Sequence, residues 1–192
     1  NVAERCDSLY WGMTKSLQAH TYGKTYNDIE EMKCHEMSFI IFNDINEKKY
    51  SDMSNLHLSQ TLFNNNRNEE SKTILKHMLS DQTIDKSIMG SVLISYAFAN
   101  AVSDNPDFLV TDQMYTKLIS DYDPSLLTYK DYWVWAYSLN KLGRSEKANS
   151  IIVQLKDIDT SGTADYWMYM IEKSNGNSQE ALKYLEKSTN KI

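Results

Sequence analysis

The sequence predicts an all-α fold built from helical hairpins, and three observations support this prediction. Only two prolines and six glycines occur in 192 residues, whereas strands joined by tight hairpins need many such turn-forming residues. Apolar side chains recur every three to four residues along much of the chain, which is the spacing of one helix face. A pattern of about 33 residues also repeats near the C-terminus. Together these features indicate antiparallel helices joined by short turns.

The repeat is clearest between residues 129 and 190. Trp133 and Trp167 lie 34 residues apart, and three further pairs lie 33 residues apart: Gly143 and Gly176, Ala148 and Ala181, Ile152 and Leu185. Each copy is typical of a helix, a turn at the glycine and a second helix, because a left-handed helix cap costs glycine little. The small alanine allows the two helices of a hairpin to approach closely.

The remaining elements follow in order from the N-terminus. The first helix is expected over about 2–20, ending near Tyr22-Gly23, and the second over about 26–46. Asn66 replaces the turn glycine in the next hairpin, because asparagine also tolerates the left-handed conformation. Residues 84–102 are apolar on nearly all sides, which indicates a central buried helix. Asn105 followed by Pro106 is typical of a helix start, so a helix is expected over about 106–120.

These elements give about five antiparallel hairpins in a single domain over residues 1–192. Their expected ranges are 2–46, 52–80, 84–121, 129–157 and 163–190. The residues quoted above resemble the tetratricopeptide repeat (TPR) family, strictly over about 129–190, with degenerate repeats at the N-terminal end. Ala136 and Tyr169 depart from the family pattern, where glycine is usual. The resemblance implies a right-handed α-solenoid in which each hairpin contacts mainly its neighbours.

The resemblance also implies a concave groove lined by the first helix of each hairpin. Its candidate ligand- or peptide-binding residues in the last two hairpins are Lys130, Trp133, Tyr137, Asn140, Lys141, Tyr166, Met170 and Lys173, and in the second hairpin they include Leu56, Gln60, Phe63 and Asn64. Aromatic rings supply rigid contact area, and amides can pair with a peptide backbone. For Trp133 and Tyr137, placement in the core and placement in the groove are equally open.

Charge and hydropathy exclude two classes of partner. The net charge is −6, and no basic cluster is longer than Lys48-Lys49, so no nucleic-acid partner is expected. Mean hydropathy is −0.56, and no apolar run of about 18 residues occurs, so no membrane span is expected. Two cysteines without a C-x-x-C motif argue against a disulfide framework, a zinc ribbon or a redox motif.

No phosphate-binding loop or nucleophile signature can be found, so we predict no enzyme activity. The densest polar cluster is Glu30, Glu31, Cys34, His35 and Glu36, in which Glu31 and His35 would share one helix face. A helix supplies two metal ligands easily, but the others must come from elsewhere. We therefore expect a solvated face, no metal and no cofactor. Catalysis would need a metal at this helix or an unrecognised pocket.

The predicted function is a non-catalytic scaffold that binds a protein or peptide partner in the concave groove. A second interpretation is an extracytoplasmic sensor or assembly segment of a larger membrane-anchored regulator. It depends on residues 166–187, whose amino-acid sequence is similar to repeat arrays of Bacteroides-type envelope proteins. That interpretation implies the bacterial cell envelope or periplasm, whereas the scaffold fits the cytoplasm as well. A homo-oligomer is a further expectation, because a truncated solenoid leaves an apolar end exposed.

Overall fold

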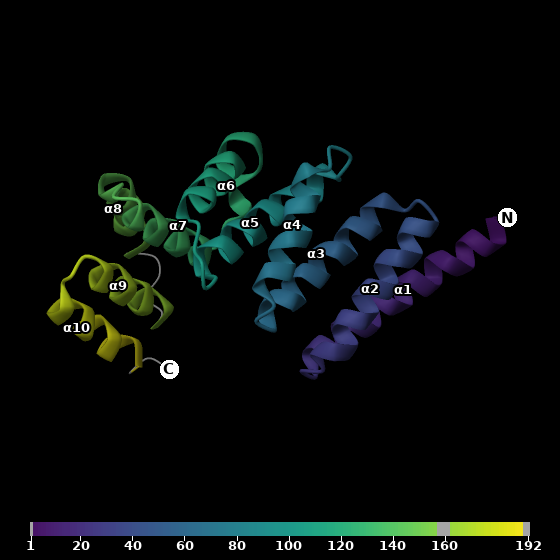
Figure 1. Ribbon diagram of the computed structural model, residues 1–192, viewed down its shortest axis with the longest axis horizontal. Coiled ribbons are helices and arrows are strands. Elements are labelled where there is room, and N and C mark those ends of the chain that lie inside the picture. Colours follow the sequence, from purple (N-terminus) through teal and green to yellow (C-terminus); the bar gives the residue numbers. More distant parts are fainter. Residues whose placement is uncertain (1, 157–161, 190–192) are drawn as a thin grey trace. The chain divides into compact units, whose positions relative to one another are not determined.

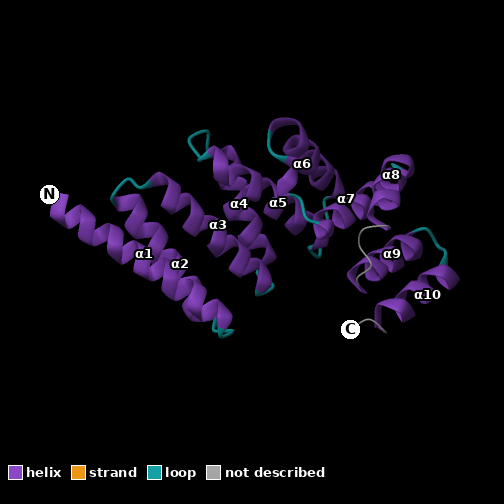
Figure 2. Ribbon diagram, turned by 180° about the vertical axis from the view of Figure 1, so that it is seen from behind, coloured by secondary structure: helices purple, strands orange, loops and turns teal. Residues whose placement is uncertain are grey.

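A computed structural model describes residues 2–156 and 162–189 of the chain (Figure 1). Within these ranges the secondary structure is helical and contains no strand, which confirms the predicted all-α class (Figure 2). The helices are α1 (Val2–Lys24), α2 (Asp28–Asp44), α3 (Lys48–Asn64), α4 (Asn68–Ser80), α5 (Lys86–Val102), α6 (Phe108–Asp121), α7 (Tyr129–Lys141), α8 (Ser145–Lys156), α9 (Gly162–Ser174) and α10 (Ser178–Thr189), with a short 3-10 helix, η1 (Pro124–Leu126), before α7.

The chain forms two compact units, Asn1–Ala99 and Asn100–Ile192, here named the N-terminal and C-terminal units. In the N-terminal unit α1 contacts α2, α2 contacts α3 and α3 contacts α4. In the C-terminal unit α7 contacts α6, α8 and α9, and α9 contacts α10. Neighbouring helices therefore pack as hairpins. The single domain predicted over residues 1–192 stays a prediction, and the predicted hairpin ends at residues 157 and 190 lie outside the described residues.

Five helix–helix turns share one backbone geometry. A residue with positive φ ends the first helix at each turn, and these residues are Tyr26, Asn46, Asn66, Gly143 and Gly176. At the third turn the Asn66 N–H donates to the Phe63 carbonyl at 3.0 Å, and the Arg67 N–H donates to the Leu62 carbonyl at 2.9 Å. This pair of bonds is the Schellman motif, and the other four turns repeat it. The backbone groups left open at each helix end are thereby satisfied.

Three predicted boundaries need correction. The first helix continues through Gly23 and turns at Tyr26. Gly23 instead allows a close approach to α2, since a Cβ there would lie 2.9 Å from Oε1 of Glu31. The chain turns at Asn46, close to the predicted end of the second helix at about 46, but α3 starts at Lys48 rather than at residue 52. Helix α6 starts at Phe108 because Asp107 is its N-cap, with Oδ1 accepting from the Val110 N–H at 3.0 Å.

The core of the N-terminal unit joins its helices in sequence order. Gly12 of α1 lies against Phe42 of α2, where a Cβ would come within 2.6 Å of the ring. The Ser38 hydroxyl connects α2 to α1 and α3. It lies 3.2 Å from the Gly12 carbonyl on α1 and 2.9 Å from the Ser54 hydroxyl on α3. A further cluster connects α3, α4 and the start of α5 through Leu56, Leu75, Met78, Ile84, Ile88 and Val92. No residue from 88 to 99 is exposed, as expected for a central helix.

The C-terminal unit is organised around a buried carboxylate on α6. Asp112 accepts a hydrogen bond from Trp135 Nε1 on α7 at 2.8 Å and from Lys147 Nζ on α8 at 3.1 Å, and it also pairs with Arg144. The two predicted small residues, Ala148 and Ala181, are both buried. They lie on the second helices of their hairpins, where a small side chain permits close packing. None of the helices in the described ranges is long and apolar enough to cross a membrane.

Candidate functional site

The predicted groove residues of α7 and α9 have different surroundings. Trp133 is fully buried, so of the two placements that the sequence leaves open, its indole takes the one in the helix core. Lys130, Lys141 and Lys173 are exposed, whereas Tyr137, Asn140 and Met170 are half-buried. Tyr166 is 45% exposed and is the most accessible aromatic ring of the set. As ligand contacts, the residues other than Trp133 stay a prediction.

The half-buried members of this set mainly join α7 to its neighbours. The Tyr137 ring lies 5.7 Å from those of Phe108 and Trp167. The Asn140 amide donates to the Ser174 hydroxyl at 2.8 Å, which ties α7 to the end of α9. Burial raises the pKa of Tyr137, Tyr166 raises it further, and Lys173 lowers it. These side chains therefore face one another, and their contacts already use much of the aromatic surface.

Two adjoining cavities lie on the N-terminal unit, over α1, α2 and α3. Their volumes are about 430 Å³ and 540 Å³, within the range of small-ligand pockets. They share His20, Glu31, Thr61 and Asn64. We name the two together the α1–α3 trough, and its remaining lining residues are Ser16, Leu17, Gly23, Lys24, Tyr26, Asp28, His35, His57, Gln60 and Asn65.

Helix periodicity brings these residues to one place. On α3, His57, Thr61 and Asn64 are separated by four and three residues, so they lie along one face. On α2, Glu31 and His35 are four residues apart and share a face in the same way. Gln60 and Asn64 were named as groove residues from the sequence, and both are exposed in the trough. By contrast Leu56, from the same set, is buried in the core.

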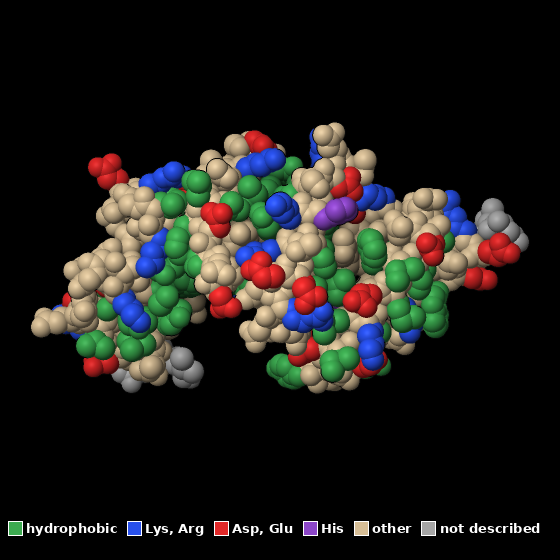
Figure 3. All heavy atoms as spheres, in the orientation of Figure 1, with side chains coloured by type: hydrophobic (Ala, Val, Ile, Leu, Met, Phe, Trp, Pro, Cys, Tyr) green, Lys and Arg blue, Asp and Glu red, His purple; other side chains and the backbone are tan. Residues whose placement is uncertain are grey.

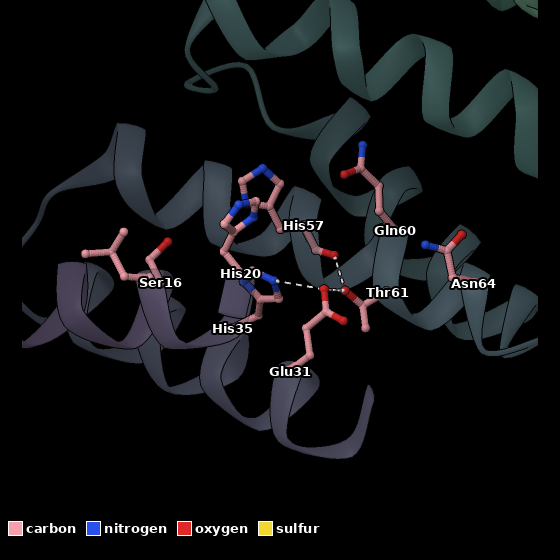
Figure 4. A pocket seen from close by; sticks show the side chains of 9 residues that line it. Ser16, His20, Glu31, His35, His57, Gln60, Thr61 and Asn64 are labelled. Carbon is pink, nitrogen blue, oxygen red and sulfur yellow. Dashed lines mark hydrogen bonds and ion pairs between the residues drawn. The ribbon is translucent and has the colours of Figure 1, made fainter. Parts of the chain in front are cut away.

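Glu31 lies at the centre of the trough, between His35 and Thr61 (Figure 4). Its Oε1 accepts a hydrogen bond from the Thr61 hydroxyl at 3.0 Å. That hydroxyl also lies 3.1 Å from the His57 carbonyl, so one proton serves two acceptors. His35 Nε2 is 3.8 Å from the same carboxylate oxygen. Among the described residues, no lysine or arginine forms an ion pair with Glu31.

His35 and Thr61 are the most buried residues of the trough. His35 is 4% exposed, and its Nδ1 has no hydrogen-bond partner. Burial lowers the pKa of His35 to about 4, with smaller contributions from His57 and His20. Burial and His20 also lower the pKa of His57, against an opposing effect of Glu31. The rings of His35 and His57 lie 5.4 Å apart. Both are therefore neutral imidazoles at neutral pH.

This cluster of histidines was not predicted from the sequence. His20, His35 and His57 come from three different helices, and a single sequence does not show which helix faces meet. The regular 20-residue spacing of the turns at Tyr26, Asn46 and Asn66 is the signal that could have aligned them. No group of three His, Cys, Asp or Glu side chains in the described part of the chain is arranged to hold a metal ion. Cys6 and Cys34 are both free thiols.

Comparison with known proteins returned no match to a family model, a curated protein or a solved structure. Figure 3 shows one face of the molecule, on which acidic and basic side chains are interspersed rather than gathered by sign. The α1–α3 trough offers mainly hydrogen-bonding groups, with three amides, three hydroxyls, three imidazoles and the central carboxylate of Glu31.

Proposed function

We propose that this chain is a non-catalytic scaffold that binds an extended protein segment or peptide in the α1–α3 trough. The observation that carries the proposal is the pair of adjoining cavities on consecutive helices of the N-terminal unit. Their shared residues make one continuous surface, which suits an elongated ligand better than a compact one. The resemblance to TPR proteins supports the part of the trough on α1 and α3, because first helices of successive hairpins line the groove in that family.

The side chains in the trough suit a peptide backbone. Every peptide residue other than proline offers one N–H donor and one carbonyl acceptor. An amide side chain can meet both needs at once, since it carries two donors and an acceptor. Gln60 and Asn64 lie one helical turn apart on α3 and are both exposed, so they can contact successive positions of an extended segment. Gln60 also donates to the Ser95 hydroxyl at 3.2 Å, which holds its side chain in place.

The proposal is tested by selecting random peptides displayed on phage against the full chain. Selected peptides are then measured on Gln60→Ala/Asn64→Ala, after circular dichroism has shown that the variant keeps its helical content. We expect this variant to bind the peptides at least about tenfold more weakly, since two central contacts are removed. Asn149→Ala/Gln154→Ala removes two exposed amides from α8 and serves as the matched control.

A third variant, Tyr166→Ala/Lys173→Ala, distinguishes the trough from the predicted surface on α7 and α9. Loss of peptide binding in this variant, with unchanged binding in the Gln60/Asn64 variant, would contradict the trough and favour the residues predicted on α7 and α9. Equal binding by all three variants would contradict both surfaces. The second interpretation, a sensing segment of a larger regulator, also requires that the segment bind a ligand. The selected peptides would therefore provide its first candidate ligands.

A further inference from the structure

We propose that the α1–α3 trough recognises a positively charged N–H donor of its bound segment, an ammonium or guanidinium group that pairs with Glu31. This inference rests on the proposed function, because it names the chemical class that the peptide-binding surface selects. It is based on two enclosed hydrogen-bond acceptors in the trough that have too few donors around them.

The first of these acceptors is the Glu31 carboxylate. Its side chain is only 18% exposed, and a carboxylate removed from water needs charge pairing or several hydrogen bonds. The Thr61 hydroxyl gives it one hydrogen bond, and that hydroxyl is shared with the His57 carbonyl. Other acidic side chains of the chain pair with lysine or arginine, as Glu30 does with Lys33 and Glu70 with Arg67. A cationic group of a ligand would give Glu31 the partner that these carboxylates have.

The second acceptor is His35. A neutral imidazole carries a proton on one nitrogen and a lone pair on the other. With Nε2 directed at Glu31, 3.8 Å away, the proton is best placed on Nε2, and Nδ1 is then the acceptor. That Nδ1 is buried without a partner, which is costly for a polar atom. An N–H donor that reaches the Glu31 carboxylate would enter the part of the trough that His35 also lines.

The charges around the trough favour a cation. The lining contains two carboxylates, Asp28 and Glu31, against one ammonium group, Lys24. The imidazoles of His35 and His57 do not oppose a cation at neutral pH, because burial lowers the pKa of each. A metal ion is the less suitable occupant, since no group of three acidic, histidine or cysteine side chains among the described residues is arranged to hold one. An organic cation needs only hydrogen-bond acceptors in reach, not a coordination shell.

The experiment titrates the intact chain with Nα-acetyl-lysine N-methylamide and follows amide and histidine resonances by NMR. The arginine analogue runs in parallel to separate guanidinium from ammonium, and the norleucine analogue supplies a side chain without charge. We expect saturable shifts at Glu31, His35 and Thr61 with the lysine or the arginine compound, and none with the norleucine compound. Glu31→Gln should weaken this binding at least about tenfold. Glu30→Gln, on the exposed side of the same helix, should leave it unchanged.

Three results would overturn the inference: equal shifts with the norleucine compound, unchanged binding in Glu31→Gln, or saturation of the same resonances by Zn²⁺ at lower concentration than by either cationic amide. The wild-type comparison of lysine with norleucine needs no variant, so it decides the matter even when Glu31→Gln loses its fold. Failure here while phage-selected peptides still depend on Gln60 and Asn64 would leave the scaffold function intact. Failure of both experiments would remove the trough as a binding surface.

Discussion

At the residue scale, five backbone positions determine where helices end and how neighbouring helices meet. Gly143 and Gly176 take φ of 73° and 80°, and nothing lies within 4 Å of a Cβ built on either residue. Their role is therefore conformational, since glycine reaches this region without steric cost. Tyr26 adopts φ of 56° with a side chain that is 90% exposed. A large side chain gains nothing there from packing and carries the cost of the left-handed conformation.

We expect Gly143→Ala to destabilise the protein by about 1 kcal/mol, because left-handed backbone strain is only partly offset by the lower entropy of the unfolded chain. Tyr26→Gly should stabilise it by up to about 1 kcal/mol for the same reason. Urea unfolding followed by circular dichroism measures both changes. Asn149→Ala, at an exposed helical position of α8, is the control and should change stability little. A stabilising Gly143→Ala would contradict the conformational role.

At the element scale, periodicity and repeat spacing were sufficient to predict most of the helices, because each depends on neighbours close in sequence. Gly143, Asn66 and Gly176 could be recognised as turns from residue type alone. Tyr26 could not, since tyrosine does not favour positive φ, and Gly23 attracted the predicted turn instead. The candidate site was predicted only in part. Gln60 and Asn64 followed from the repeat resemblance, whereas the approach of Glu31 to Thr61 depends on contacts between helices 30 residues apart.

The hairpin contacts in the C-terminal unit depend on Asp112, which connects α6 to α7 and α8. Its side chain is 7% exposed, so removing it leaves the Trp135 indole N–H buried without an acceptor. We expect Asp112→Ala to cost about 2 kcal/mol of stability, the magnitude for leaving a buried donor without an acceptor, because the partner cations Arg144 and Lys147 are about half exposed and can be solvated. Denaturant unfolding followed by the fluorescence of the indoles in this unit measures the loss.

The matched control for Asp112 is an exposed ion pair of the same unit. Lys183 and Glu180 lie 2.8 Å apart with side chains 65% and 47% exposed. Lys183→Ala should cost less than about 0.5 kcal/mol, because solvent screens the pair and holding two long side chains costs entropy. Similar losses in Asp112→Ala and Lys183→Ala would show that the network on α6 is no more important than a surface contact.

At the scale of the whole molecule, titratable groups are distributed unevenly between the two units. All four histidines, His20, His35, His57 and His77, belong to the N-terminal unit, and none belongs to the C-terminal unit. The groups that act on the buried imidazoles come from three helices: His20 on α1, Glu31 on α2 and His57 on α3. Mild acid therefore acts on one unit through a mechanism that the other unit lacks.

The sign of this effect follows from the pKa of His35, which is about 4 in the folded chain and ordinarily about 6.5. The unfolded chain thus binds a proton more readily than the folded chain. The stability associated with neutral His35 is complete above about pH 6.5 and falls progressively as the pH is lowered toward 4. At full effect the loss is about 3 kcal/mol, and protonation of His57 beside it adds to the repulsion.

We therefore expect amide hydrogen-exchange protection in residues 2–99 to fall between about pH 7 and pH 5, while protection in the described residues after 99 changes less. Protection factors corrected for the intrinsic pH dependence of exchange measure this difference. His35→Leu should flatten the pH dependence of the N-terminal unit, since it removes the group with the largest change in proton affinity. His77→Gln, at an exposed position on α4, should not. An equal loss of protection in both units, or an unchanged pH profile in His35→Leu, would contradict this mechanism. The acid sensitivity would then come from carboxylates, which occur in both units, and not from the histidines around Glu31.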